Sequence, residues 1–414
     1  MGHGCVLPTV LPVIRTRRNA AIVLLSLTMT LPVPAAAAAT TSSPAAATSS
    51  TDTSDVRFAI PRPTGQYEVG RDTLHLVDGN RRDLWLPTAG ARELMVSMYY
   101  PAHAGGSAAP YMAIDEARLL LKGQKLDSVF KAEQLAGVHT NAHVGARPVS
   151  GKHPLVVLSP GFTLNRATLT TLAEELASKG YVVALVDHAY ESFGTTFPGG
   201  RTLTCVACET VEKAPSDEAE KKLMAKAAAN RAADLSFVID QLTHAAGSAP
   251  AWKRWKMIDP RRIGAAGHSL GGNATASVMA TDHRIRAGVN MDGTFFAPIP
   301  TSGLGQRPFL MLGTKAQHSP DSIDPTWLRD WRRLDGWKRW LTVAGSGHFT
   351  FIDLPILGGQ AGITDPTAPL SGERSGEITT SYVDAFFDQH LHGEHQPLLD
   401  GPSPANPEVA FQNP

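Results

Sequence analysis

The residues best suited to chemistry in this 414-residue chain form the segment Gly267-His268-Ser269-Leu270-Gly271. An apolar run, Ile263–Ala266, precedes this segment, and a run typical of a helix, Asn273–Ser277, follows it. A serine between two glycines at a strand–turn–helix junction is the pattern of a nucleophile elbow, whose turn is too tight for side chains at the glycine positions. The hydroxyl of Ser269 would be exposed at the N-terminus of the helix, where free N–H groups stabilise negative charge. The segment therefore predicts a serine nucleophile for acyl transfer.

A serine hydroxyl is a weak nucleophile until a neighbouring base removes its proton. In α/β-hydrolases the order along the chain is serine, acid, histidine, so the base should lie C-terminal to Ser269. We expect His348, because it follows the predicted strand Trp340–Val343 in a glycine-containing loop. His318 remains an alternative. The other histidines precede a strand or lie in or after the last predicted helix (His283, His390, His392 and His395).

The acid that orients the histidine has three candidates. Asp292 stands directly after the predicted strand Ile285–Val289 and is followed by a glycine, whereas Asp321 and Asp324 lie in a polar loop after the next strand. Both positions are used by α/β-hydrolases, and the strand-end position favours Asp292. Its role would be to hold the histidine tautomer and to stabilise the imidazolium.

An oxyanion hole needs two backbone N–H groups. One should belong to Leu270, directly after the nucleophile, and the other to the loop after an early strand. The segment Ser159-Pro160-Gly161-Phe162 follows the apolar run Leu155–Leu158, and we expect the N–H of Phe162 to be the second donor.

The elements that must position these residues are short apolar strands that alternate with amphipathic helices. This alternation predicts an α/β fold with a mostly parallel sheet covered by helices on both faces, and ligands bind beyond the carboxyl ends of such strands. The expected strands are 93–100, 155–158, 181–186, 263–266, 285–289, 309–312 and 340–343, and the expected long helices are 169–179, 218–242 and 382–391.

Several stretches together resemble the plasma-type platelet-activating-factor acetylhydrolase family, in a secreted, bacterial branch. They are Pro63–Tyr67, Tyr100-Pro101, Leu158–Phe162, Leu176–Val183, Val186–His188, Gly267–Gly272, Asp292-Gly293 and Gly347-His348. The resemblance spans about residues 60–395 and implies an α/β-hydrolase fold, a carboxylic ester hydrolase without metal or cofactor, and short acyl chains. It also implies Asp292 as the acid. The loop Pro160-Gly161-Phe162 instead resembles that of cutinase-like polyester hydrolases.

The N-terminal 39 residues predict a secretory signal peptide. Arginines at 15, 17 and 18 precede the apolar stretch 20–31, and 35–39 offers A-x-A cleavage sites. Export by the Sec or the Tat route stays open. Residues 40–55 are rich in Ala, Ser and Thr and predict a disordered linker, so 56–414 should form one α/β-hydrolase domain. We expect a secreted protein.

Two insertions, 102–150 and 189–217, extend a minimal hydrolase, and the second could form a lid over the acyl site. It contains Cys205 and Cys208. A C-x-x-C pair also suits redox chemistry or zinc, but zinc would need a second pair, and an exported chain meets oxidising conditions. We therefore predict a disulfide.

The 38 basic and 38 acidic residues balance, which argues against a nucleic-acid partner. No cluster has metal-ligand spacing. We expect a monomer that hydrolyses a small-molecule or lipid ester, with transient contact to a lipid surface. A triacylglycerol lipase or a cutinase-like polyester hydrolase is the alternative, and peptidase activity stays open. A non-catalytic binding protein of this fold would lack a triad member, and none is missing here.

Overall fold

The computed structural model describes residues 56–243 and 250–414. The predicted signal peptide (1–39) and linker (40–55) lie outside these residues. None of the described helices is long and apolar enough to cross a membrane.

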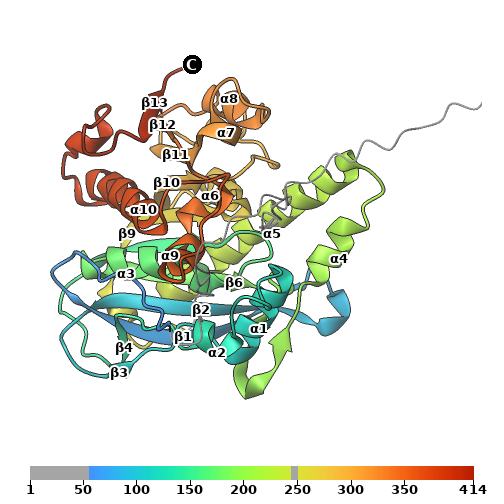
Figure 1. Cartoon of the computed structure of the whole chain (residues 1–414), viewed down its shortest axis with the longest axis vertical. Helices are drawn as coiled ribbons and strands as arrows, with labels where there is room; N and C mark the ends of the chain where they lie inside the picture. The colour runs from blue at the N-terminus through green and yellow to red at the C-terminus, as the bar shows by residue number, and fades with distance from the viewer. Residues whose placement is uncertain (1–55, 244–249) are drawn as a thin grey trace, which may run out of the picture.

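A central sheet of eleven strands has the order β13-β12-β11-β10-β9-β5-β6-β2-β1-β4-β3 (Figure 1). Its strands are β1 (Glu68–Arg82), β2 (Ala91–Ala102), β3 (Ser107–Ala108), β4 (Ala142–Val144), β5 (His153–Ser159), β6 (Val182–His188), β9 (Ile258–His268), β10 (Ile285–Met291), β11 (Phe309–Thr314), β12 (Lys338–Val343) and β13 (Val409–Gln412). The six strands from β6 through β5, β9, β10 and β11 to β12 run parallel, whereas β2 and β13 join this block antiparallel. The mostly parallel α/β-hydrolase sheet expected from the sequence is confirmed.

Helices lie on both faces of this sheet. The α-helices of the described residues are α1 (Ile114–Gly123), α2 (Ala132–Ala136), α3 (Thr170–Ser178), α4 (Val206–Glu212), α5 (Asp217–Thr243), α6 (Leu270–Thr281), α7 (Lys315–His318), α8 (Thr326–Trp331), α9 (Asp353–Gln360) and α10 (Gly372–Phe387). Of these, α3 and α10 lie in one half of the core and α5 and α6 in the other.

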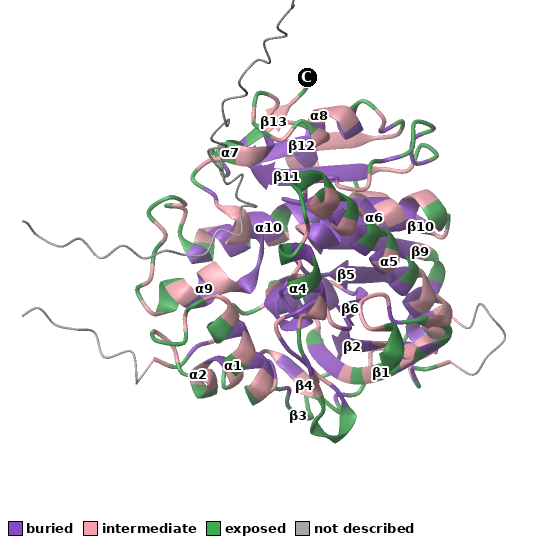
Figure 2. Ribbon diagram, turned by 90° about the vertical axis from the view of Figure 1, so that its right-hand side faces the viewer, coloured by how far each residue is buried: buried purple, intermediate pink, exposed green. Residues whose placement is uncertain are grey.

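Alternate residues of each central strand pack into different halves of the core. In β5, Val156 and Leu158 join the cluster that contains α3 and α10, while Leu155 and Val157 join the cluster that contains α5 and α6. Successive side chains of a strand point to opposite faces, so a strand buried on both faces is apolar throughout. Figure 2 shows these strands as the buried centre of the molecule.

The last long helix begins earlier than the sequence pattern indicated. We expected it over 382–391, but α10 starts at Gly372, capped by the Ser371 hydroxyl, and a π-helical turn, Asp388–His392, continues it. Glycines at 372 and 376 weaken the helical pattern, yet both are buried: a side chain at Gly372 would collide with the backbone of Pro355. Close packing of the helix overrides its local propensity.

The insertion 189–217 folds into a two-stranded hairpin, β7 (Thr195–Thr196) and β8 (Thr202–Leu203), followed by α4. A disulfide joins Cys205 to Cys208 at the start of α4, as predicted. The other insertion contributes α1 and α2 and the edge strands β3 and β4.

Candidate active site

Ser269 occupies the tight turn between β9 and α6. Its backbone has φ 55° and ψ −123°, which is unusual for a residue with a side chain, and its N–H bonds to the carbonyl of Met291 at 2.8 Å. A Cβ at Gly267 would lie 2.2 Å from the Gly271 carbonyl carbon, and one at Gly271 would lie 2.0 Å from the carbonyl oxygen of Ser159. The two glycines therefore permit the turn, as the motif required.

Ser269, His348 and Asp292 come together at the carboxyl ends of β9, β12 and β10. His348 Nε2 lies 3.0 Å from Ser269 Oγ, and His348 Nδ1 lies 2.6 Å from Asp292 Oδ2. Because a carboxylate only accepts hydrogen bonds, Nδ1 carries the proton and Nε2 of the neutral ring is free to accept the serine proton. Ser269 and His348 are half-buried, whereas Asp292 is buried.

The Asp292 carboxylate is held by more than His348. Its Oδ1 accepts the backbone N–H of Thr314 at 2.7 Å and lies 2.6 Å from Nδ1 of His318. Burial alone would raise the pKa of Asp292, but the charge and hydrogen bond of His318, with those of His348, hold this pKa well below its usual range. Asp292 therefore remains an anion that orients His348.

His268, inside the elbow motif, holds the backbone of His348, a contact that the sequence analysis did not predict. Its Nε2 donates to the backbone carbonyl of His348 at 2.7 Å, and the two rings lie 4.7 Å apart. Burial, and then the charge of His348, lowers the pKa of His268 to about 3, so the ring is neutral. The sequence signal for this contact was the position of His268 directly before Ser269, because a side chain at that position must point away from that of Ser269.

The segment Ser159–Phe162 packs directly on the turn after the nucleophile. The backbone of Ser159 and Pro160 touches Gly271, and half-buried Phe162 belongs to the same apolar cluster as Leu270. Within the described residues, the N–H groups of Phe162 and Leu270 make no hydrogen bond. The two N–H groups that the sequence predicts as oxyanion donors are therefore unpaired among the described residues.

A buried hydrogen-bond network supports the loop Ser159–Phe162. Ser159 Oγ lies 2.9 Å from His188 Nε2, and His188 Nδ1 lies 2.8 Å from Asp234 Oδ2. Arg231 donates to the carbonyl of Pro160 at 2.5 Å and to Glu191 at 2.7 Å. These charges are fully buried and paired, so each has a fixed partner when the loop is in place.

An apolar cluster lies beside the turn that contains Ser269. Leu270 and Phe162 lie in one cluster with residues from the segment before β2, from α4 and α5, and from the loop after β10: Trp85, Val211, Leu223, Met224, Ala227, Ala228, Phe296 and Ala297. The α4–α5 arm, which extends away from the sheet in Figure 1, therefore contributes apolar side chains to the same cluster as Leu270, the residue after Ser269.

The other residues that the sequence offered as acid or base occupy different positions. His318 and Asp324 stand behind Asp292, with His318 Nε2 3.2 Å from Asp324 Oδ2. The Asp321 side chain makes no hydrogen bond or ion pair within the described residues. His283 precedes β10 at the opposite end of the strand.

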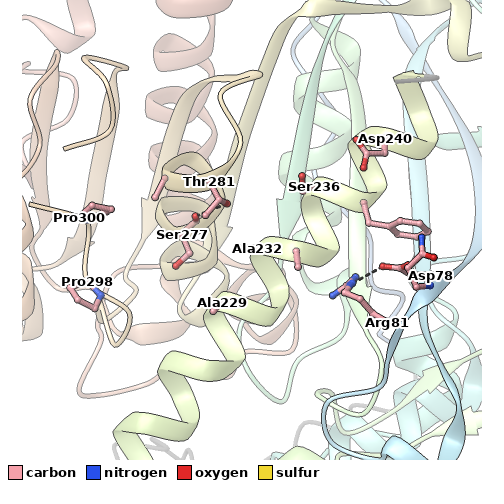
Figure 3. A pocket seen from close by; sticks show the side chains of 14 residues that line it. Asp78, Arg81, Ala229, Ala232, Ser236, Asp240, Ser277, Thr281, Pro298 and Pro300 are labelled. Atoms are coloured by element: carbon pink, nitrogen blue, oxygen red, sulfur yellow. Dashed lines mark hydrogen bonds and ion pairs between the residues drawn. The ribbon is translucent and has the colours of Figure 1, made fainter. Parts of the chain in front are cut away.

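A groove of about 700 Å³ lies between β1, α5 and α6 and contains no triad residue (Figure 3). Its lining is mostly small side chains, and its charges are paired: Arg81 bonds to Asp78 and Asp234, and Asp240 to Arg284. Nothing in it is arranged for catalysis.

Comparison with known proteins relates this chain to ester hydrolases. A model of the family "Platelet-activating factor acetylhydrolase, isoform II" matches residues 53–365. A "Probable 1-alkyl-2-acetylglycerophosphocholine esterase" of Arthroderma benhamiae is 28% identical over 86% of this chain and 94% of its own length. The "Platelet-activating factor acetylhydrolase" of Cavia porcellus is 22% identical over 58% of each chain.

A solved structure, a "Ferulic acid esterase from Streptomyces cinnamoneus", is 41% identical, with a TM-score of 0.74 over 86% of this chain and 100% of its own. The family model covers most of the chain, and the relatives are named as ester hydrolases. The chain therefore belongs to the platelet-activating factor acetylhydrolase isoform II family and is a carboxylic ester hydrolase.

Proposed function

We propose that this protein is a secreted serine esterase that uses Ser269 as nucleophile, His348 as base and Asp292 as the acid. The hydrogen bonds of His348 carry the proposal: 3.0 Å from Nε2 to Ser269 Oγ and 2.6 Å from Nδ1 to Asp292 Oδ2. Nucleophile, base and orienting carboxylate in this order are the requirements of acyl transfer to serine.

In the first half of the reaction, Ser269 Oγ attacks the carbonyl carbon of the ester while His348 Nε2 takes its proton. The negative charge then develops on the former carbonyl oxygen, where the N–H of Leu270 at the N-terminus of α6 and the N–H of Phe162 in the loop after β5 would stabilise it. His348 returns the proton to the leaving alcohol, and the acyl group stays on Ser269.

In the second half, His348 takes a proton from water, which attacks the acyl-enzyme. The second tetrahedral intermediate collapses to release the carboxylic acid, and the proton returns to Ser269. Neither half requires a metal, so we expect turnover to persist in EDTA.

We propose esters of small acyl groups as the preferred substrates, including acetylated phospholipids. Two observations support this: one relative is named an acetylglycerophosphocholine esterase and another an acetylhydrolase, and half-buried Phe162 shares an apolar cluster with Leu270, the residue after Ser269. A bulky ring next to the oxyanion position limits the space for a long acyl chain.

Esters of aromatic acids are a second candidate. The structural neighbour that is 41% identical is named a ferulic acid esterase, and Phe162, Phe296 and Trp85 share the cluster beside Ser269. Offset or edge-to-face contacts between such rings and an aromatic acyl group would favour its binding.

A substrate panel separates these alternatives. p-Nitrophenyl esters from acetate to palmitate, an acetylated phospholipid, methyl ferulate and a polyester film should be hydrolysed in parallel. We expect the highest kcat/KM at acetate to butyrate. A maximum at methyl ferulate would favour the aromatic substrate, and a rate that rises with chain length or at an oil–water interface would favour a lipase.

Ser269→Ala tests the nucleophile itself. We expect turnover to fall by several powers of ten, because only binding and the oxyanion donors remain. Ser277→Ala, in the same helix α6 but in the groove of Figure 3, is the matched control and should keep full activity. A fluorophosphonate should label Ser269 in the wild type; an active Ser269→Ala protein would refute the proposal.

A further inference from the structure

Asp292 has two histidine partners, one on each carboxylate oxygen. His348 bonds to Oδ2, and His318 Nδ1 lies 2.6 Å from Oδ1. His318 is the last residue of α7 and contacts the Asp292 carboxylate oxygen that His348 does not contact. A triad needs only one histidine, so the second requires its own explanation.

His318 is locked in place on every side. Its side chain is 2% exposed, its ring stacks on Trp327 at a centroid distance of 4.2 Å and an angle of 16°, and its carbonyl accepts the indole N–H of Trp340 at 2.7 Å. Gly313 leaves room for the ring, since a Cβ there would lie 2.9 Å from that of His318. Such a fixed ring cannot exchange one partner for another.

Both nitrogens of this ring face carboxylates. Nδ1 meets Asp292, and Nε2 lies 3.2 Å from Oδ2 of Asp324, which also accepts the Thr294 hydroxyl. Ionised carboxylates accept but do not donate, so a ring that satisfies both must carry a proton on each nitrogen and is an imidazolium. Burial opposes this charge, but Asp292 and then Asp324 raise the pKa of His318 to about 9.

The titratable groups that face this ring are Asp292 and Asp324, with the rings of His348 and His268 beyond Asp292. The residues that β11, α8 and β12 pack against it do not titrate in the working range; they are Gly313, Trp327 and Trp340. Two carboxylates and one imidazolium leave the buried group with one net negative charge.

We propose that His318 is a positioning residue of the reaction: held as a cation between Asp292 and Asp324, it orients the Asp292 carboxylate and weakens the attraction of that carboxylate for a proton on His348. The proposal rests on the triad of the proposed function. A base must be neutral to accept the serine proton, so a cation behind the acid keeps His348 active at lower pH.

The net charge of the group formed by Asp292, His318 and Asp324 predicts in which direction each variant shifts the pH profile. His318→Asn keeps a neutral donor near the Nδ1 position but removes the cation, so the group becomes more negative and His348 holds its proton to higher pH. Asp324→Asn removes a negative charge and acts in the opposite direction. The double variant restores the wild-type net charge.

The test is the pH profile of kcat/KM for a p-nitrophenyl ester with these three variants. We expect the acid limb to move up by about one pH unit in His318→Asn, to stay or move down in Asp324→Asn, and to return toward the wild type in the double variant. At the plateau, kcat of His318→Asn should fall by no more than about tenfold, with KM unchanged. His390→Asn, another histidine packed on a tryptophan (Trp337), is the control and should leave the profile unchanged.

A second measurement does not depend on activity. ¹⁵N NMR of the histidine rings should show one imidazolium that does not titrate between pH 6 and 8 and that is missing from His318→Asn. A neutral His318, or an acid limb unmoved by His318→Asn, overturns the proposal while leaving the triad intact. A double variant no closer to wild type than His318→Asn assigns the ring to packing and overturns it as well. An active Ser269→Ala would overturn the triad and, with it, the role of His318.

Discussion

At the scale of single residues, the position of Asp292 separates it from the other acidic candidates. Its backbone lies at φ 56°, and its N–H continues the sheet by bonding to the carbonyl of Leu312 at 2.8 Å. Gly293 follows because a Cβ there would lie 2.1 Å from the Ser269 carbonyl oxygen. Asp292 is therefore built into the end of β10 and held against the turn that contains Ser269.

This placement predicts the effect of substituting each acid. Asp292→Asn should lower kcat by about 10³–10⁴-fold, because an amide no longer selects the tautomer in which His348 Nε2 is free. Asp321→Asn, in a side chain without partners among the described residues, should stay within about twofold. Steady-state kinetics at the pH optimum compares the two; a larger loss in Asp321→Asn would move the acid to the loop after β11.

The sequence was sufficient to select Ser269, Asp292 and His348, whose side chains the fold brings into hydrogen-bond contact, because each stands at the carboxyl end of a strand that an apolar run predicts. It was insufficient for His268 and His318, whose partners lie about 80 and 26 residues away along the chain. No local pattern relates such pairs. The sheet order β9-β10-β11-β12, which sets the carboxyl ends of these strands side by side, creates them.

At the scale of elements, the prediction succeeded where strands are buried on both faces and failed where they are not. β1 alternates between exposed and buried residues and lies near the sheet edge, and no strand was predicted there. β13 is short and pairs only with β12. These two strands contain few apolar residues, because β1 is buried on only one face and β13 has only one neighbouring strand.

The insertion 189–217 is tied to the oxyanion loop by its backbone. Thr163 N–H bonds to the carbonyl of Glu191 at 2.9 Å, and Phe193 N–H bonds to the carbonyl of Thr163 at 2.7 Å. The insertion thus supports the loop that presents Phe162, and a lid role for its outer part stays a proposal.

The disulfide in this insertion should act locally. Intact-mass analysis with alkylation should find no free thiol at Cys205 or Cys208 before reduction. Because the closed loop is very short, Cys205→Ser/Cys208→Ser should reduce the free energy of unfolding by about 2 kcal/mol or less. A loss of all ester hydrolysis in this folded variant would instead show that the pair is needed by the active site.

At the scale of the whole molecule, buried ionisable groups set the pH of greatest stability. Burial raises the pKa of Asp353 to about 7 and, against the charge of Arg166, that of Asp187 to about 6. Their folded pKa values exceed the unfolded ones, so stability is lost as the pH rises from about 4 to these values. The raised pKa of His318 has the same sign between about 6.5 and 9. Asp234 and Asp292 have lowered pKa values, and their contributions are lost below about pH 4.

The lowered pKa of buried His268 acts in the opposite direction between about pH 3 and 6.5 and offsets part of the loss caused by the buried carboxyl groups. We therefore expect the melting temperature to decline from about pH 6.5 toward pH 9, where His318 loses its proton. Asp353→Asn should reduce the loss between pH 4 and 7 by on the order of 3 kcal/mol, because the amide cannot ionise. Exposed Asp127→Asn is the control. Scanning calorimetry across this range measures both; equal slopes in Asp353→Asn and wild type would contradict the argument.

The buried network of Ser159, His188 and Asp234 supports the loop Ser159–Phe162. Comparing it with Ser269, His348 and Asp292 shows what a reactive serine requires beyond its hydrogen bonds. Ser159, His188 and Asp234 repeat the order of the active set, with 2.9 Å and 2.8 Å between successive partners. Yet Ser159 is 0% exposed and stands at the end of a strand rather than at the start of a helix. Hydrogen-bond order alone would identify two hydrolase centres in this chain. Solvent access and a place at the start of a helix distinguish Ser269, which we propose is acylated, from Ser159, which only holds a loop.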